Sequence, residues 1–396
     1  MKCLICSNQI SPFINFGKMP IANGFLKESE FSEEYFYELA VAFCNSCYMV
    51  QLTEQPDRKL MFHENYAFYS STSKAMAAHF EVWAKDVMDK YKPEFVVEIG
   101  SNDGIMLRHF TCERLGIEPS WNVAQVATGK GIETLCYFFD DKVADVIVDK
   151  YKQADVILAA NVMCHISDIH SVIKGVKKLL KPEGVLIFED PYLGDILEKV
   201  SYDQIYDEHA FYFSVTSLSN LFAMHNMEII DVEHQDTHGG SMRYTVANKG
   251  VHKQSLRHFQ ATIEESHRYG IKLPETYEKF EFAVKTSKIN LAYLLQTLRF
   301  QGKRVVGYGA TSKSTTVLNY CGITPDLLEF ICDTTPIKQY KFSPGMHIPI
   351  VPHEVFSCDG TEYPDYALLF AWNHAKEIMA KEKFTGRWFT YVDGII

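Results

Sequence analysis

Four cysteines near the start of the chain form two Cys-x-x-Cys pairs, Cys3 with Cys6 and Cys44 with Cys47. Each pair can sit on a tight turn whose two thiolates face one ion, and two such turns complete the tetrahedral four-sulfur shell that zinc prefers. The shell has no open position, so the predicted ion supports folding and takes no part in chemistry. Unmetallated thiols, a redox pair, disulfides and a DNA-binding finger are the alternatives to this zinc site.

Length and composition limit what the rest of the chain can be. The 396 residues exceed the usual size of one hydrophobic core, so two or three domains are expected. Hydrophobic residues make up 47% of the chain and the formal net charge is -11, which predicts a folded protein with no nucleic-acid partner. The sequence lacks a secretory signal pattern and a run of 18 apolar residues, so we expect a cytoplasmic protein that contacts no membrane.

Apolar runs alternate with helical patterns through the middle of the chain. A helix is expected from residue 73, with apolar residues on one face at Met76, Phe80, Trp83 and Val87. The stretch 24–69 before it reads as irregular. Strands are expected at 95–100, 114–119, 155–162 and 184–190, followed by an antiparallel pair at 227–235 and 242–248. This alternation predicts a parallel sheet covered by helices.

A third region repeats the same logic on a smaller scale. Residues 252–300 have a helical pattern, and strand-like runs follow at 305–309, 328–333 and 366–370. We therefore predict three domains, with boundaries at 1–75, 76–280 and 281–396.

A glycine-containing turn follows the strand expected at 95–99, with Gly100 and Gly104 at its two ends. Such a turn lets the backbone pass close to a bound nucleoside, although the glycine triplet of a pyrophosphate loop is missing. Glu118 lies 20 residues beyond Glu98, where its two carboxylate oxygens can accept both ribose hydroxyls. These residues by themselves leave S-adenosylmethionine, a dinucleotide and no ligand open.

The segment 201–214 combines acids, a histidine and five aromatic residues. His209 is a base that titrates near neutral pH, and the adjacent Glu208 is a carboxylate that can orient it. A histidine in an aromatic segment is more often packed or at the surface, so this segment alone does not assign a catalytic role.

A second polar patch occupies residues 237–243 and contains His238, two glycines, Ser241 and Arg243. Glycines allow close approach of the backbone, and the guanidinium can grip a carboxylate or phosphate oxygen. A turn with a structural Arg–Asp pair is the alternative.

Several motifs together carry a resemblance to a known family. Besides the four cysteines they are Glu98-Ile-Gly-Ser-Asn-Asp-Gly104, Gly116-Ile-Glu-Pro119, Asn161-Val162, His165-Ile166, Asp168, Phe188-Glu-Asp-Pro-Tyr192, Tyr206-Asp-Glu-His209, Asn319-Tyr-Cys-Gly322, Lys338-Gln339, Pro344-Gly345 and Ala371-Trp-Asn-His374. In this order, and over essentially the whole length, the chain resembles the zinc-containing, S-adenosylmethionine-dependent sugar C-methyltransferases.

The resemblance implies an α/β fold in three parts: an N-terminal four-cysteine zinc-binding domain, a class I (Rossmann-like) methyltransferase core and a smaller Rossmann-like C-terminal α/β domain. It implies S-adenosylmethionine as the cofactor and zinc as a structural ion. The implied cofactor residues are Glu98, Gly100, Asn102, Asp103, Gly104, Glu118 and Asn161.

The resemblance also implies catalytic roles for Tyr206, Glu208 and His209. A carbon has no lone pair, so its methylation requires removal of a proton next to a ketone, and His209 is the implied base. Tyr206, or Tyr66 from the zinc domain, is the implied hydrogen-bond donor to the carbonyl oxygen. Glu208 then orients His209 or holds a sugar hydroxyl.

Substrate residues are implied in the second patch and in the C-terminal domain, which helps to hold the nucleotide-linked sugar. They are Tyr66, His238, Ser241, Arg243, Tyr308, Lys313, Asp333, Trp372 and Asn373.

The function expected from these features is methylation at C3 of a TDP- or GDP-linked 4-keto-6-deoxyhexose, in deoxysugar biosynthesis. We also expect a monomer, although no residue pattern speaks to the number of chains. An NAD-dependent sugar-nucleotide oxidoreductase or epimerase and a noncatalytic zinc-ribbon binding protein are the alternatives.

Overall fold

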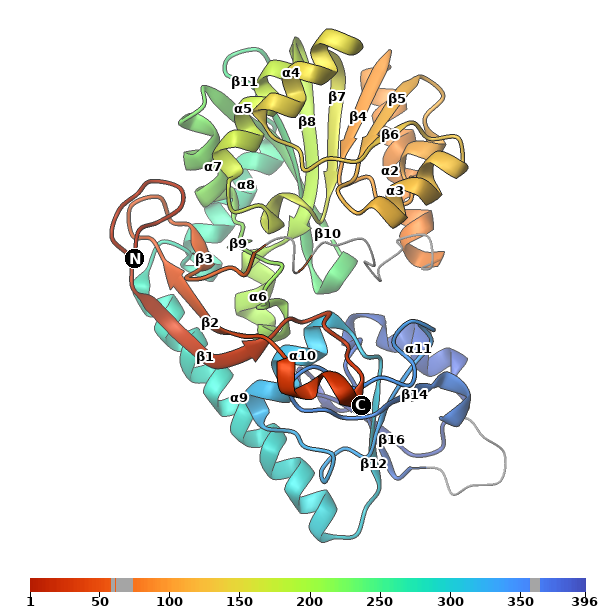
Figure 1. Cartoon of the computed structure of the whole chain (residues 1–396). Coiled ribbons are helices and arrows are strands. Elements are labelled where there is room, and N and C mark those ends of the chain that lie inside the picture. The colour runs from red at the N-terminus through yellow and green to blue at the C-terminus, as the bar shows by residue number, and fades with distance from the viewer. Residues whose placement is uncertain (58–60, 62–73, 357–363) are drawn as a thin grey trace.

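The computed structural model describes residues 1–57, 61, 74–356 and 364–396. Two α/β parts lie one above the other, and strands from the N-terminus join them at one side (Figure 1). Within the described chain, no helix has the length and apolar character needed to cross a lipid bilayer. The α/β class that was predicted from the alternating pattern is confirmed.

The upper part contains a seven-stranded sheet. Its strands are, in order across the sheet, β10 (Met227–Gln235), β11 (Ser241–Asn248), β8 (Leu180–Pro191), β7 (Ala154–Ala160), β4 (Phe95–Ile99), β5 (Glu113–Ile117) and β6 (Thr134–Leu135). The strands from β8 to β6 are parallel, and β11 is antiparallel to both of its neighbours. This sheet matches the class I methyltransferase core that the resemblance implies.

Alternating side chains of the central strands point to opposite faces of this sheet. In β4, Phe95, Val97 and Ile99 belong to one apolar cluster and Val96 to another. Helices α4 (Asp141–Lys150), α5 (Ile169–Leu179) and α7 (Val215–Ala223) supply residues to the first cluster, and α2 (Lys74–Tyr91) supplies residues to the second. Burial on both faces explains why these strands are almost continuously apolar in sequence.

The lower part is a smaller sheet of six strands. They are, in order, β14 (Ile350–Pro352), β13 (Ile331–Asp333), β12 (Val305–Tyr308), β15 (Tyr366–Leu369), β16 (Arg387–Thr390) and β17 (Gly394–Ile395). Helices α10 (Ser312–Cys321) and α11 (Ala375–Lys381) belong to this part. The long helix α9 (Pro274–Phe300) leads into it and runs without interruption through the expected boundary at residue 280.

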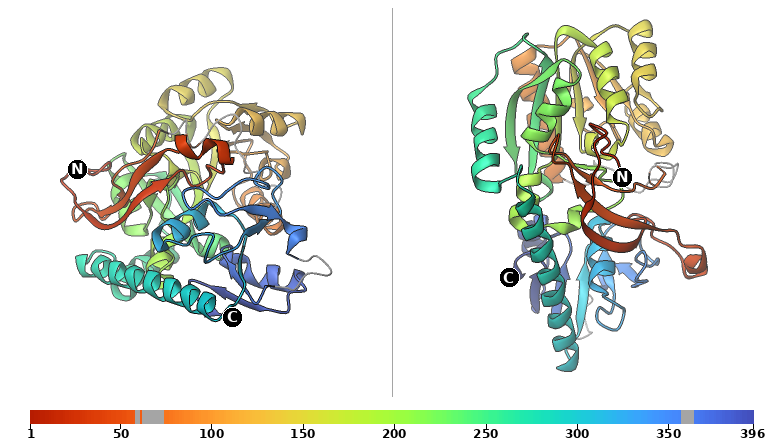
Figure 2. Two further views of the ribbon diagram at one scale, coloured as in Figure 1. Left: turned by 60° about the horizontal axis from the view of Figure 1, so that its bottom comes forward. Right: turned by 90° about the vertical axis from the view of Figure 1, so that its left-hand side faces the viewer.

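The N-terminal strands form a third sheet, and its composition corrects the expectation of an irregular stretch at 24–69. Its strands are, in order, β1 (Pro12–Pro20), β2 (Phe36–Phe43), β3 (Val50–Leu52) and β9 (Phe211–Tyr212). In β2, the alternate residues Tyr37, Leu39, Val41 and Phe43 are buried together. Strand β9 comes from the segment 201–214, so this sheet links the N-terminus to the predicted catalytic segment (Figure 1). Figure 2 shows the red N-terminal strands from two further sides.

The four cysteines of the two pairs converge at one end of this sheet. The Cys3 and Cys47 sulfurs are 3.6 Å apart, the Cys6 and Cys44 sulfurs 3.4 Å, and all four lie within 4.8 Å of one another. Four sulfurs at about 2.3 Å from one zinc ion are spaced at about 3.8 Å in a tetrahedron. The cluster therefore fits a closed zinc site with a structural role.

The two cysteine turns are anchored on the upper part. The Ile5 carbonyl, in the first turn, accepts a hydrogen bond from Nε2 of His170 at 2.9 Å. The Cys47 carbonyl, in the second turn, accepts one from Asn220 at 3.2 Å. Since His170 and Asn220 lie on α5 and α7, the zinc site holds β2 and β3 in a fixed position relative to the large sheet.

We expect Cys44→Ser to lose its zinc and to become less stable by about 3 kcal/mol or more in the free energy of unfolding, because three thiolates no longer close the shell. Zinc content after chelator treatment and thermal unfolding measure the two effects. Cys136→Ser is the matched control, since Cys136 is an exposed cysteine outside the cluster. Full zinc content and unchanged unfolding in Cys44→Ser would contradict the structural role.

Candidate active site

Two turns at the carboxyl ends of the parallel strands have strained backbones. Asn102 follows β4 with a φ of 48°, and Asn161 follows β7 with a φ of 55°. Gly100 has a φ of 67°, and a Cβ atom there would lie 2.2 Å from the side chain of Val162. A ligand in an α/β sheet binds outside the carboxyl ends of the strands, and strain of this kind is concentrated at such sites.

Buried polar atoms without a partner surround these turns. Within the described part of the chain, no hydrogen bond reaches Oε2 of Glu98, Oγ of Ser101 or Oδ1 of Asn161. Burial, with nearby Glu118 and Asp103, raises the pKa of Glu98 well above its ordinary value. Buried polar groups are costly unless they are paired, so these atoms fit a bound polar ligand such as the amino-acid end of S-adenosylmethionine.

Glu118 is held rigidly at the end of β5. One carboxylate oxygen accepts a hydrogen bond from the Asn102 amide at 3.1 Å, and the other accepts one from the Ser120 amide at 2.8 Å. Each oxygen keeps a second lone pair, so the carboxylate can still accept ribose hydroxyls. Asp103, on the same turn as Asn102 and Gly104, is paired with Lys130 at 2.9 Å.

The catalytic segment is positioned by the N-terminal sheet. Strand β9 pairs with β3, Phe211 opposite Gln51 and Tyr212 opposite Val50. The side chain of Gln55 donates to the backbone carbonyls of His165, at 3.0 Å, and Asp207, at 3.2 Å. The N-terminal part, which carries the cysteine cluster, therefore holds the residues just before β9 in position.

His209 is buried, and its two ring nitrogens have different partners. Nδ1 lies 2.7 Å from the Gln204 carbonyl oxygen, and Nε2 lies 2.9 Å from the Tyr206 hydroxyl. A carbonyl can only accept, so Nδ1 carries the proton and Nε2 presents its lone pair to the hydroxyl. Burial, and then the positive charge of the nearby Lys313, lower the pKa of His209 well below 6.5. The imidazole is therefore a neutral base with Nε2 as its basic atom.

His165 belongs to the same site, although the sequence did not single it out as a site residue. It ends η4 (Met163–His165), which directly follows the turn after β7. Its ring stacks on that of His209, with centroids 5.2 Å apart and planes inclined by 23°. Burial lowers the pKa of His165 to about 4, so it adds no positive charge beside the base. The stacking places His209 next to the carboxyl end of β7.

Two buried acids beside His209 are held by residues of the N-terminal part. Asp207 accepts a hydrogen bond from the Ala22 amide at 2.9 Å, and Glu208 accepts one from the Asn23 side chain at 2.6 Å. Asn23 in turn accepts a hydrogen bond from Ser312 of the C-terminal part at 2.9 Å. Burial raises the pKa of both acids, and the proximity of Asp207 raises that of Glu208 further. All three parts of the chain thus meet at this segment.

The C-terminal part approaches the site from the opposite side. Lys313, in α10, is half-buried and donates to the His238 carbonyl at 3.1 Å. Trp372 donates from its indole nitrogen to Asp203 at 2.7 Å and packs against Gly239, where a Cβ atom would lie 2.5 Å from the ring. His238, Lys313 and Trp372 were predicted from separate motifs, and the structure brings them together. We call the place where the three parts of the chain meet, around residues 203–209, the junction.

Lys338 is a further cation at the junction. It belongs to a motif of the family resemblance, but it was not predicted as a site residue. Its ammonium donates to the Ala310 carbonyl at 2.8 Å and lies over the ring of Phe25 at 4.9 Å. Burial lowers its pKa, while nearby Asp333 and Glu208 oppose that effect. Asp333 fixes the glycine turn after β12, because its carboxylate accepts a hydrogen bond from the Ala310 amide at 2.7 Å.

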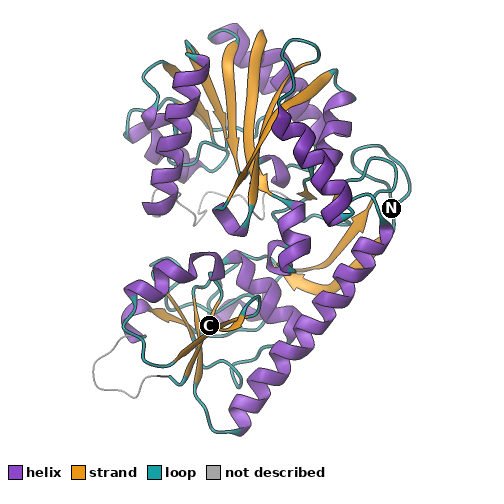
Figure 3. Cartoon of the chain, turned by 180° about the vertical axis from the view of Figure 1, so that it is seen from behind, coloured by secondary structure: helices purple, strands orange, loops and turns teal. Residues whose placement is uncertain are grey.

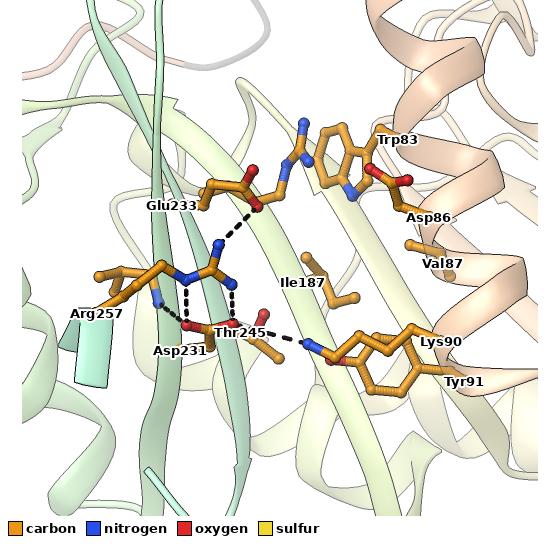
Figure 4. Close-up of a pocket in the computed structure, with 12 residues that line it drawn as sticks. Trp83, Asp86, Val87, Lys90, Tyr91, Ile187, Asp231, Glu233, Thr245 and Arg257 are labelled. Atoms are coloured by element: carbon orange, nitrogen blue, oxygen red, sulfur yellow. Dashed lines mark hydrogen bonds and ion pairs between the residues drawn. The ribbon is translucent and has the colours of Figure 1, made fainter. Parts of the chain in front are cut away.

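Arg243 lies in β11, and its side chain faces Trp83 of α2. Its guanidinium pairs with Glu189 at 3.0 Å and covers the ring of Trp83 at 4.2 Å. It also lines a small cavity of about 60 Å³, shown in Figure 4, in which Arg257 and Lys90 both pair with Asp231. These contacts hold the guanidinium in place, and the substrate role of Arg243 stays a prediction.

The remaining predicted substrate residues are less closely associated with the junction. The Tyr308 ring packs against Phe356 and Trp388, and its hydroxyl donates to Glu382 at 2.7 Å. Ser241 is buried and donates to the Thr237 carbonyl at 3.1 Å. Asn373 is half-buried beside Trp372, and Tyr66 lies outside the described residues.

Three family models match the chain. One described as a zinc binding domain matches residues 3–62, one described as a methyltransferase domain matches residues 76–232, and one described as a C-methyltransferase C-terminal domain matches residues 236–392. Their order agrees with the three parts seen in the structure.

Two solved structures resemble part of the chain. They are an S-adenosylmethionine-dependent methyltransferase from Clostridium acetobutylicum (13% identity, 44% of this chain and 92% of that chain, TM-score 0.36) and the PH0226 protein from Pyrococcus horikoshii (16%, 46% and 95%, TM-score 0.37). Each covers less than half of this chain, and the assignment does not rest on them.

A characterised relative covers almost the whole chain. The C-methyltransferase NovU of Streptomyces niveus is 31% identical over 390 residues, which are 96% of this chain and 92% of NovU. The match spans the cysteine cluster, the large sheet and the C-terminal sheet together. The chain therefore belongs to the family of zinc-containing, S-adenosylmethionine-dependent C-methyltransferases.

Proposed function

We propose that the protein transfers a methyl group from S-adenosylmethionine to C3 of a TDP- or GDP-linked 4-keto-6-deoxyhexose. The observation that carries this proposal is a buried, neutral imidazole, His209, between the turns after the parallel strands and the C-terminal part. A base is needed because the carbon next to a ketone becomes a nucleophile only after it loses a proton.

The proton moves from C3 of the sugar to Nε2 of His209. The Gln204 carbonyl holds Nδ1–H and so directs the basic nitrogen away from the backbone. In the free enzyme the Tyr206 hydroxyl occupies that nitrogen at 2.9 Å. Substrate binding frees the hydroxyl, which then donates to the C4 oxygen and stabilises the enolate charge that forms there.

S-adenosylmethionine, when bound, supplies the electrophilic methyl group that C3 accepts. The unpaired atoms of Glu98, Ser101 and Asn161 are suited to its amino-acid end, and Glu118 is suited to its ribose. His165 lies between the proposed cofactor site and the base, because it follows the Asn161 turn and its ring stacks on that of His209.

The nucleotide diphosphate is held by the C-terminal part in this proposal. Lys313 and Lys338 are half-buried cations, and each donates to a backbone carbonyl rather than to a carboxylate of the described chain. Helix α10 starts beside them, and the amino end of a helix favours an anion. Two ammonium groups at a helix start are well suited to a diphosphate.

Replacing the base is expected to abolish most of the activity. We expect His209→Asn to slow methyl transfer by about 10²–10⁴-fold, the usual contribution of a positioned general base. S-adenosylmethionine binding, followed by calorimetry, should change little because the cofactor turns are untouched. His267→Asn, at an exposed histidine, is the control. A variant at position 209 with at least one tenth of wild-type activity would refute the role of the base.

The low pKa of His209 predicts an unusual pH profile. A base with a pKa of about 6.5 would lose roughly three quarters of its active form between pH 8 and pH 6. Because the pKa of His209 is lowered, its base form persists, and we expect the rate to fall by less than about twofold over this range.

The same profile should be recorded for Asp207→Asn and Glu208→Gln, since burial raises the pKa of both acids into this pH range. An inflection near pH 6.5 that is present in the wild type and in both variants would contradict the state assigned to His209.

The proposed diphosphate site predicts a selective loss of substrate affinity. We expect Lys313→Gln to raise KM for the nucleotide-linked sugar by roughly 10- to 150-fold, because a hydrogen bond to a charged group contributes about 1.5–3 kcal/mol. Affinity for S-adenosylmethionine should be unchanged. Lys303→Gln, at a half-exposed lysine paired with Asp365, is the control. Equal KM values for both variants would exclude Lys313 from the substrate site.

A further inference from the structure

Helix α9 carries two apolar seams on opposite sides. One is buried inside the protein and consists of Tyr277, Phe280, Val284, Leu291, Leu295 and Leu298. The other, which we call the outer seam, consists of Phe282, Thr286, Ile289, Tyr293, Gln296 and Phe300, and all six residues are exposed. The spacing of the outer seam alternates between four and three residues, the heptad pattern of a coiled coil.

The outer seam exposes large apolar side chains. The exposed fractions are 73% for Phe282, 66% for Ile289, 71% for Tyr293 and 94% for Phe300. Figure 3 shows α9 as a long rod along the outer edge of the molecule. At about 1.5 Å per residue, the seam from Phe282 to Phe300 is about 27 Å long. Single exposed apolar residues are ordinary, but a continuous seam of this length indicates an interaction surface.

We propose that the outer seam binds the outer seam of a second copy of this chain, with the two α9 helices antiparallel. The order of residue types is apolar, polar, apolar, apolar, polar, apolar, and it reads the same in both directions. In an antiparallel pair about a twofold axis near residue 291, Phe282 faces Phe300 of the partner subunit. Thr286 then faces Gln296 of the partner subunit, and Ile289 faces Tyr293 of the partner subunit.

In this register, every apolar residue of the outer seam packs against an apolar residue of the partner. The two polar residues, Thr286 and Gln296, can form a hydrogen bond across the pair. A parallel pair would also match like with like, but it would stack Gln296 on its own copy and place the like-charged helix ends side by side. Antiparallel pairing sets the helix dipoles in opposite directions, which is favourable.

A hollow lies where this register needs one. It is lined by Gln296, Arg299, Phe300, Thr324 and Leu327 at the carboxyl end of α9. The register brings Phe282 of the partner subunit to this end, so its ring can enter the hollow. Two of the flanking cations are already paired with acids, Lys285 with Glu281 at 2.7 Å and Arg299 with Asp326 at 3.8 Å.

The area is sufficient for a specific interface. A fully exposed aromatic side chain offers about 200 Å², so the three rings and Ile289 together offer roughly 600 Å² per chain. The pair then buries about 1,200 Å² before the flanking residues are counted, which reaches the lower limit for specific interfaces. The proposal replaces the expectation of a monomer and is independent of the proposed reaction.

The first test measures the mass of the protein in solution by analytical ultracentrifugation over a concentration series. The wild-type chain is expected to reach the mass of two chains and to dissociate on dilution. The double variant Ile289→Asp/Tyr293→Asp should raise the dissociation constant by more than about 30-fold, because it places charges at the centre of the seam. Its methyl-transfer activity and thermal unfolding should match those of the wild type.

The matched control is Ile263→Asp in helix α8 (Leu256–Glu264). Ile263 is 59% exposed and forms a separate apolar patch with Leu256 and Phe259. It should leave the dissociation constant unchanged. A wild-type chain that stays monomeric at every concentration would overturn the proposal, and so would a dimer that Ile263→Asp dissociates and the α9 variant does not.

The register is tested by mild oxidation of Thr286→Cys/Gln296→Cys. The antiparallel pair places each new cysteine opposite the other kind in the partner, so covalent dimers should form with the double variant and not with either single variant. Each single variant separates its two copies by about 15 Å along the helix, too far for a disulfide. Efficient crosslinking of Thr286→Cys alone would overturn the antiparallel arrangement.

Discussion

The pairing of β3 with β9 is the interaction on which the site depends. It joins the N-terminal sheet to the segment that carries His209, through Gln51 opposite Phe211 and Val50 opposite Tyr212. Two residues beyond β3, Gln55 holds the His165 and Asp207 carbonyls. The cysteine cluster closes the turn between β2 and β3 and is bonded to α5 and α7. A structural zinc site thus fixes the position of the proposed base, which is far from it in sequence.

Burial gives this junction its chemical character. The same loss of water that keeps His209 neutral also raises the pKa of Asp207 and Glu208 and lowers that of Lys313 and Lys338. Each of these pKa changes means that burial makes the charged form of the group less stable. Water does not screen interactions at the junction, so a bound anion or polar ligand interacts strongly with these groups. The strained turns after β4 and β7 are suited to a cofactor in the same way, because a bound ligand would pair the buried polar atoms that have no partner in the described chain.

The sequence was most informative where a local pattern reports directly on structure. The spacing of the cysteines predicted the cluster, and the apolar runs predicted the large sheet, because a strand buried on both faces is almost wholly apolar. Strand β2 was missed although Tyr37, Leu39, Val41 and Phe43 alternate clearly. The two residues of β9 could not be predicted, since β3 is the only strand with which they pair among the described residues. Asn23, His165 and Lys338 were likewise not predicted as site residues, because tertiary contacts alone bring them to His209.

The account rests on His209 as the base that removes the C3 proton, and exchange of that proton with solvent reports on this step before any methyl group moves. The measurement is nuclear magnetic resonance of the nucleotide-linked 4-keto sugar in deuterated water, with S-adenosylhomocysteine in place of the methyl donor. The account predicts that the wild-type enzyme replaces the C3 hydrogen with deuterium. With His209→Asn, this exchange should be no faster than in the sugar without enzyme. Exchange by the variant at the wild-type rate would contradict it.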